Sequence, residues 1–259
     1  MTLPPLDRDA VARARAVLVP LDAIAVLTGA GISTDSGIPD FRGPNGVWTK
    51  NPEAERRSSI DDYLADPDVR RAAWRVRVDS EMWGARPNPG HEAVVDLERQ
   101  GRLHTLVTQN IDGLHADAGT SPERLVEVHG TVRETQCLEC GARGPMAATL
   151  DRVRAGEEDP PCLVCGGLLK SATISFGQAL VEDDLRRAEV AALHADALVA
   201  AGTSLVVYPV AAMVPIALER DIPVVIVNAE PTPFDDEATV VVRGSTSDAL
   251  PLLFGGGDR

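Results

Sequence analysis

Short apolar runs, four to six residues long and bounded by glycine, proline or polar residues, recur along the chain. A run this short, with apolar residues facing both ways, is typical of a strand that is buried on both faces of a parallel sheet. The pattern therefore predicts parallel strands at residues 23–28, 103–108, 125–128, 197–201, 223–227 and 239–242.

Stretches with helical periodicity separate several of these runs. Residues 7–19 form an amphipathic pattern rich in Ala and Arg, and Ser247 is the expected N-cap of a last helix ending at Phe254. Further helices are predicted at residues 89–100, 182–193 and 210–220. Because strands and helices alternate, we expect an α/β fold with a Rossmann-like parallel sheet and helices on both faces.

Two long segments interrupt this alternation. Residues 35–88 are rich in Pro, Gly, Arg and Trp and contain helical patches, and residues 131–170 hold every cysteine. Neither segment fits a short strand-to-helix connection, so both are expected to be insertions at the edge of the sheet. The predicted organisation is a Rossmann-like domain from residues 1–130 and 171–259, with a loop and helical insertion at 35–88, and a small module at 131–170.

The composition narrows the class of partner. The chain has 259 residues, 44% of them hydrophobic, with a net charge of −14 and a pI of about 4.7. An acidic surface disfavours nucleic acids and anionic membranes and weakly favours basic partners, although solubility alone explains the charge. No apolar run approaches the ~20 residues that span a bilayer, and the N-terminus lacks a signal-peptide core. We therefore expect a cytoplasmic protein with no membrane contact.

The four cysteines form two close pairs, Cys137 with Cys140 and Cys162 with Cys165. Disulfides are rare in a reducing compartment, and two Cys-x-x-Cys turns separated by 21 residues have the spacing of a four-thiolate zinc site. Four protein ligands leave no open position for a substrate, so one structural zinc ion is expected. A redox pair or buried free thiols are the alternatives.

A glycine-rich turn, Thr28-Gly-Ala-Gly-Ile-Ser-Thr-Asp-Ser-Gly37, follows the first predicted strand. Glycines at this place let the backbone approach a pyrophosphate. The turn is not the dehydrogenase fingerprint, because the third glycine would fall at Thr34. A tight strand-to-helix connection explains the turn equally well on this evidence.

The motifs that follow resemble those of the sirtuin family. Gly29-Ala-Gly-Ile-Ser33 with Gly37-Ile-Pro-Asp-Phe-Arg42 resembles the first family signature, and Thr108-Gln-Asn-Ile-Asp-Gly-Leu-His115 resembles the second. Further matches follow in the family's order: His129-Gly130, the paired cysteines, Phe176-Gly177, Gly202-Thr-Ser204 and Asn228. The resemblance extends from about Ala23 to Leu253.

The resemblance implies a Rossmann-like NAD-binding domain, with a cofactor loop in residues 35–88 and a zinc-binding module at 131–170. It also implies an enzyme that consumes NAD as a co-substrate to remove acyl groups from protein lysine side chains. The products would be nicotinamide, O-acyl-ADP-ribose and the deacylated lysine. Acylated-lysine proteins or peptides are then the expected partners, and acetyl is the first acyl group to test.

The resemblance also assigns roles to individual residues. His129 follows a predicted strand directly, and an imidazole there can accept a proton near neutral pH. By resemblance it is the catalytic base, with Asn110 and Asp112 completing the catalytic set. Asp112 and the Ile111 backbone would hold the nicotinamide carboxamide, and Phe41 would guard nicotinamide departure. The implied NAD contacts are Gly29, Ala30, Gly31, Ser33, Asp40, Phe41, Arg42, Gln109, Asn110, Ile111, Asp112, Gly202, Thr203, Ser204, Asn228 and Thr246. The implied substrate contacts are Ile174, Ser175, Phe176, Gly177 and Val206.

Simpler interpretations exist for several of these residues. Without the resemblance, His129 would be taken as a structural histidine, and Asn110 and Asp112 as residues of a capped turn. An exposed turn explains Thr246 equally well. The histidines His91, His104 and His194 fit ordinary helix or strand positions, and His115 is expected to support the site rather than act as a second base.

Two departures from the family pattern fall in the substrate segment. Ser171 stands where many sirtuins have proline, and Gln178 where they have glutamate. The segment is expected to pair its backbone with the substrate as an added strand, a role that both changes permit. The Tyr and Arg pair that binds acidic acyl groups in one sirtuin branch is not evident, because Tyr63 and Arg71 have the wrong spacing. A neutral acyl group is therefore expected.

Other function classes use the same residues. A protein ADP-ribosyltransferase would share the NAD pocket. A non-catalytic NAD or ADP-ribose sensor would not need His129, Asn110 and Asp112, so their presence counts against it. A nucleic-acid-binding zinc ribbon is the weakest alternative, because few basic residues accompany the cysteines. The sequence gives no prediction of the oligomeric state.

Overall fold

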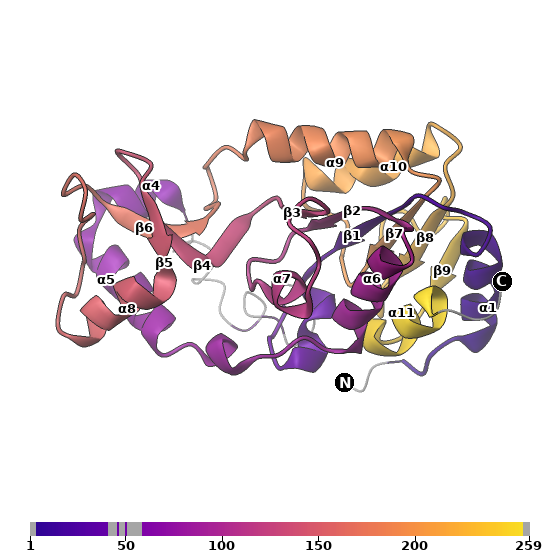
Figure 1. Ribbon diagram of the computed structural model, residues 1–259, viewed down its shortest axis with the longest axis horizontal. Coiled ribbons are helices and arrows are strands. Elements are labelled where there is room, and N and C mark those ends of the chain that lie inside the picture. The colour runs from indigo at the N-terminus through magenta and orange to yellow at the C-terminus, as the bar shows by residue number, and fades with distance from the viewer. Residues whose placement is uncertain (1–3, 41–45, 47–49, 51–58, 256–259) are drawn as a thin grey trace.

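The computed structural model describes residues 4–40, 46, 50 and 59–255. Its larger part is a six-stranded sheet in the order β3-β2-β1-β7-β8-β9 (Figure 1), and every neighbouring pair is parallel. The strands are β1 (Ile24–Thr28), β2 (Leu103–Thr108), β3 (Leu125–Glu127), β7 (Ala197–Ala201), β8 (Val224–Val227) and β9 (Val240–Val242). All six lie within or coincide with the predicted runs, so the sequence prediction of a Rossmann-like sheet is confirmed.

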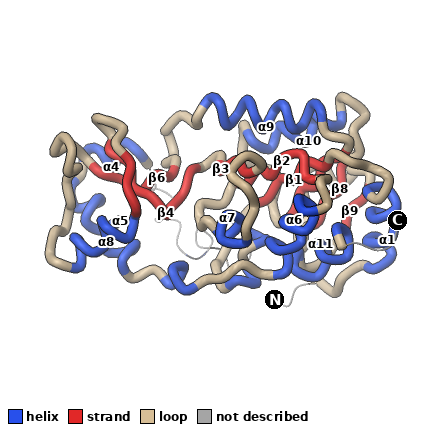
Figure 2. The backbone as a smooth tube through the Cα atoms, in the orientation of Figure 1, coloured by secondary structure: helices blue, strands red, loops and turns tan. Residues whose placement is uncertain are grey.

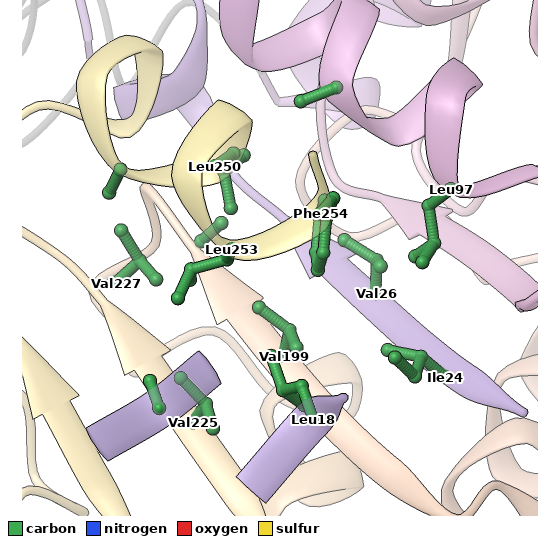
Figure 3. Close-up of a cluster of buried hydrophobic side chains, with 14 of the residues drawn as sticks. Leu18, Ile24, Val26, Leu97, Val199, Val225, Val227, Leu250, Leu253 and Phe254 are labelled. Atoms are coloured by element: carbon green, nitrogen blue, oxygen red, sulfur yellow. The ribbon is translucent and has the colours of Figure 1, made fainter. Parts of the chain in front are cut away.

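The strands are mostly apolar because successive side chains enter opposite buried layers. In β1, Ile24 and Val26 belong to one buried cluster, and Ala25 and Leu27 belong to the other. The first cluster packs under α1 (Arg8–Leu18), α6 (Pro89–Arg99) and α11 (Thr246–Phe254). Figure 3 shows Phe254 of α11 between Leu250, Leu97 and Val26 in this layer.

The opposite face of the sheet is covered by α9 (Glu182–His194), the 3-10 turn Val210–Ala212 and α10 (Met213–Leu218). Small side chains of α9, including Ala188, Ala191 and Ala192, bring this helix close to the strands. Figure 2 shows α9 and α10 above the strands and α6 and α11 below them. The sheet is therefore the middle layer of three, as the alternating pattern predicts.

A second, smaller sheet lies at the other end of the molecule (Figure 1). It is antiparallel, in the order β5-β4-β6, with strands β4 (Gly130–Cys137), β5 (Arg143–Pro145) and β6 (Leu169–Thr173). Trp74, Met146, Leu150 and Leu169 form its core with the buried cysteines. The helices packed in this small module are α4 (Ile60–Ala65), α5 (Pro67–Val78) and α8 (Met146–Arg154).

The small module is larger than the segment 131–170. The predicted boundaries fall inside β4 and β6, and α5 of the 35–88 insertion packs on α8 rather than on the large sheet. Trp74 of α5 is 2% exposed within the module core. The described helices of the insertion and the cysteine segment thus share one hydrophobic core.

Two local expectations are wrong. The N-cap of α11 is Ser245, not Ser247, because Ser245 has the extended backbone of a cap and its Oγ accepts from the Ser247 N–H at 3.0 Å. The helix expected at residues 210–220 begins as a 3-10 turn and ends at Leu218. Among the described helices, none combines the length and apolar character needed to cross a membrane.

Candidate active site

The order in which strands are added to the large sheet reverses between β1 and β7. From β1, the strands β2 and β3 extend to one side and β7, β8 and β9 to the other. Turns at the carboxyl ends of two such strands diverge and leave a crevice, which is where open α/β sheets bind ligands. The glycine-rich turn after β1 and the turn after β7 meet at this switch point.

Glycine residues of the two turns contact each other at this switch point. The Gly31 N–H donates to the Gly202 carbonyl oxygen at 2.8 Å, and Gly202 has a positive φ of 62°. A Cβ on Gly31 would lie 2.8 Å from the Gly202 Cα, and one on Gly202 would lie 2.4 Å from the Ile32 nitrogen. Neither turn accepts a side chain here, because each packs directly on the backbone of the other. This contact brings the peptide groups of both turns to the switch point, where open α/β sheets bind ligands.

Gln109 ties the ends of three strands together. Its N–H donates to the Thr28 carbonyl at 3.0 Å, and its side-chain amide donates to the Thr203 hydroxyl at 3.0 Å. Thr28 ends β1 and Thr203 lies in the turn after β7, while Gln109 itself follows β2. Residues predicted from three separate motifs therefore lie within hydrogen-bond distance of one another.

Asn110, Ser33 and Asp112 form a buried hydrogen-bonded set beside this bridge. The Asn110 amide donates to the Gly29 carbonyl and to Ser33 Oγ, both at 3.1 Å, and Ser33 Oγ donates to Asp112 Oδ2 at 2.8 Å. Asp112 Oδ1 also accepts from the Leu114 N–H at 2.9 Å, at the start of α7 (Leu114–Ala118). Asp112 does cap a turn, but its second oxygen is directed to the glycine-rich segment.

His129 lies at the end of β3, next to these groups. Its Nδ1 is 2.9 Å from the Gln109 carbonyl oxygen. A carbonyl only accepts, so Nδ1 carries the proton and Nε2 of the neutral ring holds the lone pair. The imidazole is half-buried. The fold thus fixes one tautomer, the one in which Nε2 is a base.

Two further histidines lie beneath the site. His91 was expected to be an ordinary helix residue, but its ring is completely buried, with Nε2 3.5 Å from Ser33 Oγ. Burial lowers the pKa of His91 to about 4, against an opposing effect of Asp112. The ring of His115 lies 4.7 Å from that of His91, and His115 Nε2 is 3.0 Å from Thr28 Oγ1. Burial, and then His91, lower the pKa of His115, so the fold disfavours a charge on either ring.

The sequence contained part of the signal for His91. Asn88 and His91 have the spacing of a capping box, and the Asn88 N–H does donate to His91 Nδ1 at 3.3 Å. The sequence did not show where this helix start would dock. Asn88 donates to the Ile32 carbonyl at 2.7 Å and to Ser36 Oγ at 2.9 Å, which places His91 against Ser33.

Two further predicted NAD contacts are Thr246, at the start of α11, and Asn228, after β8. Thr246 is the first residue of α11 and is 4% exposed, so the alternative of an exposed turn is excluded. Its Oγ1 has no hydrogen-bond partner among the described residues, and neither has Ser247 Oγ. Asn228 follows β8 and donates from its side chain to the Glu230 carbonyl at 2.8 Å. Both hydroxyl oxygen atoms, Thr246 Oγ1 and Ser247 Oγ, are buried by the protein itself, so neither is open to a ligand in this conformation.

The predicted substrate segment, Ile174 to Gly177, continues β6. Its first N–H, on Ile174, donates to the His129 carbonyl at 2.8 Å, and the Phe176 carbonyl accepts from the Ile60 N–H at 2.9 Å. The departure at Gln178 is accommodated, because its Oε1 accepts from the Ser175 N–H at 3.3 Å. The segment is thereby joined directly to the backbone of His129.

The structure describes most, but not all, of the remaining predicted site residues. Val206 is 49% exposed on the loop after β7, next to Leu205, which has a positive φ of 56°. Asp40 is half-buried, and Ala30 and Ser204 lie in the two turns at the switch point. Phe41 and Arg42 lie outside the described residues.

The four cysteines lie together in the small module. Their sulfur atoms are all within 4.8 Å of one another, and the Sγ–Sγ distances are 3.5 Å for Cys137–Cys165 and 3.8 Å for Cys140–Cys162. Four thiolates about 2.3 Å from one ion in a tetrahedron are separated by about 3.8 Å. N–H groups of the two knuckles, at Glu139, Cys140, Val164 and Gly167, point to the sulfurs at 3.4–3.5 Å. The cysteines are therefore positioned to bind a structural zinc ion.

Comparison with known proteins agrees with this geometry. The model of the Sir2 family matches residues 29–209, which include the glycine-rich turn, His129, the cysteines and the turn after β7. The chain belongs to the Sir2 family. A relative from Streptomyces coelicolor, NAD-dependent protein deacetylase 2, is 50% identical over 90% of this chain and 97% of its own length. NAD-dependent protein deacylase 2 of Archaeoglobus fulgidus is 37% identical over 95% of both chains.

Solved Sir2 structures share the whole fold. A structure from work on the mechanism and regulation of Sir2 enzymes superposes with a TM-score of 0.85 at 36% identity, covering 95% of this chain and 97% of that chain. A Sir2 variant with a deacetylated p53 peptide and 3′-O-acetyl ADP ribose gives a TM-score of 0.85 at 33% identity, covering 94% and 96%. The sirtuin resemblance of the sequence is thus confirmed along nearly the full chain.

Proposed function

We propose that this Sir2-family chain is an NAD-dependent protein lysine deacylase that acts first on acetyl-lysine. The observation that carries the proposal is the position of His129, whose Nδ1 is held by the Gln109 carbonyl beside the set formed by Asn110, Ser33 and Asp112. The relatives named deacetylase and deacylase, and the Sir2 complex with a deacetylated peptide, support the same activity.

The residues at the switch point suit NAD. Peptide groups of the turns at Gly31 and Gly202 would hold the diphosphate, since the two turns meet backbone to backbone at the switch point. Thr246, the first residue of α11, would contact the adenosine end. Asp112 and the Ile111 backbone would hold the carboxamide, with Asn110 on the ribose side. When bound, NAD supplies a ribose that is released from nicotinamide and transferred to the acyl oxygen of the substrate.

The chain's own contribution is to orient the reactants and to move one proton. In this proposal, His129 Nε2 accepts a proton from a ribose hydroxyl, which a neutral imidazole does near pH 7. The Gln109 carbonyl keeps the proton on Nδ1 and so keeps Nε2 available. The segment 174–177 would receive the acyl-lysine peptide as an added strand. The bond from its first N–H to the carbonyl of His129 places the segment beside the proposed base.

A neutral acyl group is favoured by the position of the side chains that would otherwise bind a carboxylate. Tyr63 is 6% exposed and its hydroxyl donates to the Leu169 carbonyl at 2.6 Å. Arg71 pairs with Asp68 on the surface of α5 at 2.6 Å. Neither is directed to the substrate segment as a pair, so acetyl and other uncharged acyl groups are the proposed substrates.

The test is turnover of an acetyl-lysine peptide with NAD by wild type, His129→Ala and a control, His194→Ala, which removes an exposed histidine at the end of α9. Loss of a general base lowers kcat by about 10²–10⁴-fold. We expect that loss for His129→Ala with an unchanged melting temperature, and wild-type turnover for His194→Ala. Wild-type turnover by His129→Ala would contradict the assigned base.

The same assay separates transfer of ADP-ribose to protein. With NAD labelled in its adenine, deacylation releases the label as a small O-acyl-ADP-ribose, whereas an ADP-ribosyltransferase leaves it on protein. Nicotinamide release that depends on the acetyl-peptide, with free label, is the expected result. Protein-bound label without peptide dependence would favour the transferase.

A further inference from the structure

A single arginine of the small module contacts the turn that we assign to the nicotinamide carboxamide. Arg133 lies in β4, where the pairing with β6 is interrupted between the Gly130–Thr173 and Thr135–Ser171 pairs. An irregularity of this kind redirects a side chain out of the regular ladder. The Arg133 N–H donates to Thr131 Oγ1 at 3.2 Å, in keeping with its departure from the ladder.

The residues in this irregular stretch bond to the turn at 111–113 instead. The Val132 N–H donates to the Ile111 carbonyl at 2.8 Å, and Arg133 Nε donates to the Asp112 carbonyl at 3.0 Å. The same guanidinium reaches Asp117 Oδ2 in α7 at 2.5 Å. Arg133 therefore joins Asp112, two residues before α7, to Asp117 near the end of that helix.

The other side of the guanidinium faces the core of the small module. Its central carbon lies 6.0 Å from the ring centre of Trp83, and Trp83 packs against the cluster that contains the buried cysteines. Gly113 makes room for the arginine, because a Cβ at this residue, whose φ is 75°, would lie 2.7 Å from Arg133 Nε. The turn and the arginine are thus fitted to each other.

We infer that Arg133 is a positioning residue for the nicotinamide end of the NAD pocket: it fixes the carbonyl of Asp112 and helix α7 from the small module. This inference rests on the proposed function for the roles of Ile111 and Asp112. Asp112 uses its side chain for Ser33 and Leu114, so the orientation of its peptide group depends on contacts from outside the turn. Arg133 and Val132 supply those contacts.

The deciding measurement compares two ligands that differ only in nicotinamide. Arg133→Met keeps an unbranched stem against Trp83 and removes every donor of the guanidinium. We expect the dissociation constant for NAD to rise about tenfold, the cost of losing a charge-assisted hydrogen bond, and that for ADP-ribose to stay within twofold. In turnover with an acetyl-peptide, the KM for NAD should rise while the KM for peptide does not.

Arg143→Met is the matched control. Arg143 lies in β5 of the same sheet and pairs with Glu134 at 2.7 Å, and among the described residues it makes no hydrogen bond or ion pair with the turn at 111–113. We expect both dissociation constants to match wild type. If Arg133→Met melts below the assay temperature, R133K serves the same comparison, since lysine keeps the charge but lacks the fork that spans Asp112 and Asp117.

Two results would overturn the inference. Unchanged NAD affinity in Arg133→Met would show that the turn is held without the arginine, and equal weakening of NAD and ADP-ribose would show general damage to the pocket. Because direct binding is measured, an absence of wild-type deacylation would count against the proposed function and leave the assignment of Arg133 to be decided by the two affinities.

Discussion

The large sheet and the small module bury their side chains in different ways. Strands of the large sheet place apolar residues in two separate clusters, and three helices close one of them. Among the described residues, the small module has one cluster of six buried residues, two of which are Cys137 and Cys162. A core this small seldom supports a fold without a metal or a disulfide. The comparison indicates that burial of apolar surface maintains the large sheet and that zinc maintains the module.

Removing the zinc ligand is the strongest way to test this difference. We expect Cys137→Ser, or a strong chelator, to cost several kcal/mol, because binding free energy at a structural zinc site is folding free energy. The effect should be confined to the module, seen in calorimetry as a separate transition at lower temperature. Activity should fall with it, because β4 and β6 lead directly into His129 and Ile174.

Zinc analysis supplies the control for that experiment. Wild-type protein should contain one equivalent of zinc, and returning zinc after chelation should restore the single high-temperature transition. A cysteine variant that retains one equivalent of zinc and melts as wild type does would contradict a structural role for the ion.

A substitution in the core of the large sheet should destabilise that sheet and leave the zinc site intact. Phe254 is fully buried between α11, α6 and β1, and replacement of such a residue by alanine costs about 3–5 kcal/mol. We expect Phe254→Ala to lower the free energy of unfolding of the large sheet by that amount, while the zinc content stays at one equivalent. Leu163→Ala, at a site 83% exposed in a cysteine knuckle, should change stability by less than about 0.5 kcal/mol.

The same difference explains what the sequence predicted well. The strands of the large sheet are local patterns, and β2 and β7 have the predicted bounds. The four cysteines that lie together were also identified from their spacing, whereas the role of His129 comes from the sirtuin resemblance and stays a prediction. Side chains that act across the fold were not predicted: His91 reaches Ser33 through the docking of Asn88 on Ile32, and no local pattern encodes that contact. The docking of α5 on α8 is likewise a long-range packing event.

Glu127, the last residue of β3, lies where the two regions meet. Burial raises the pKa of this carboxyl, the negative charges of Asp112 and Glu134 add to the rise, and Arg143 and Arg133 oppose it. The net effect is a rise of the pKa from 4.5 to about 7. Between pH 4.5 and about 7 the folded protein holds a proton that the unfolded chain has lost. The protonated carboxyl therefore stabilises the folded state fully below pH 4.5, and this stabilisation is lost as the pH rises to about 7.

Glu127→Gln should remove that dependence. The amide resembles the protonated carboxyl, so the variant should be about 1–2 kcal/mol more stable than wild type at pH 8, a value reduced for the partial exposure of the side chain. The two proteins should have equal stability near pH 4.5. Urea unfolding at several pH values measures this, with Glu123→Gln, an exposed position on the loop before β3, as the control for charge alone. Parallel stability curves for wild type and Glu127→Gln would contradict the prediction and would show that the carboxylate is well accommodated where the large sheet meets the small module.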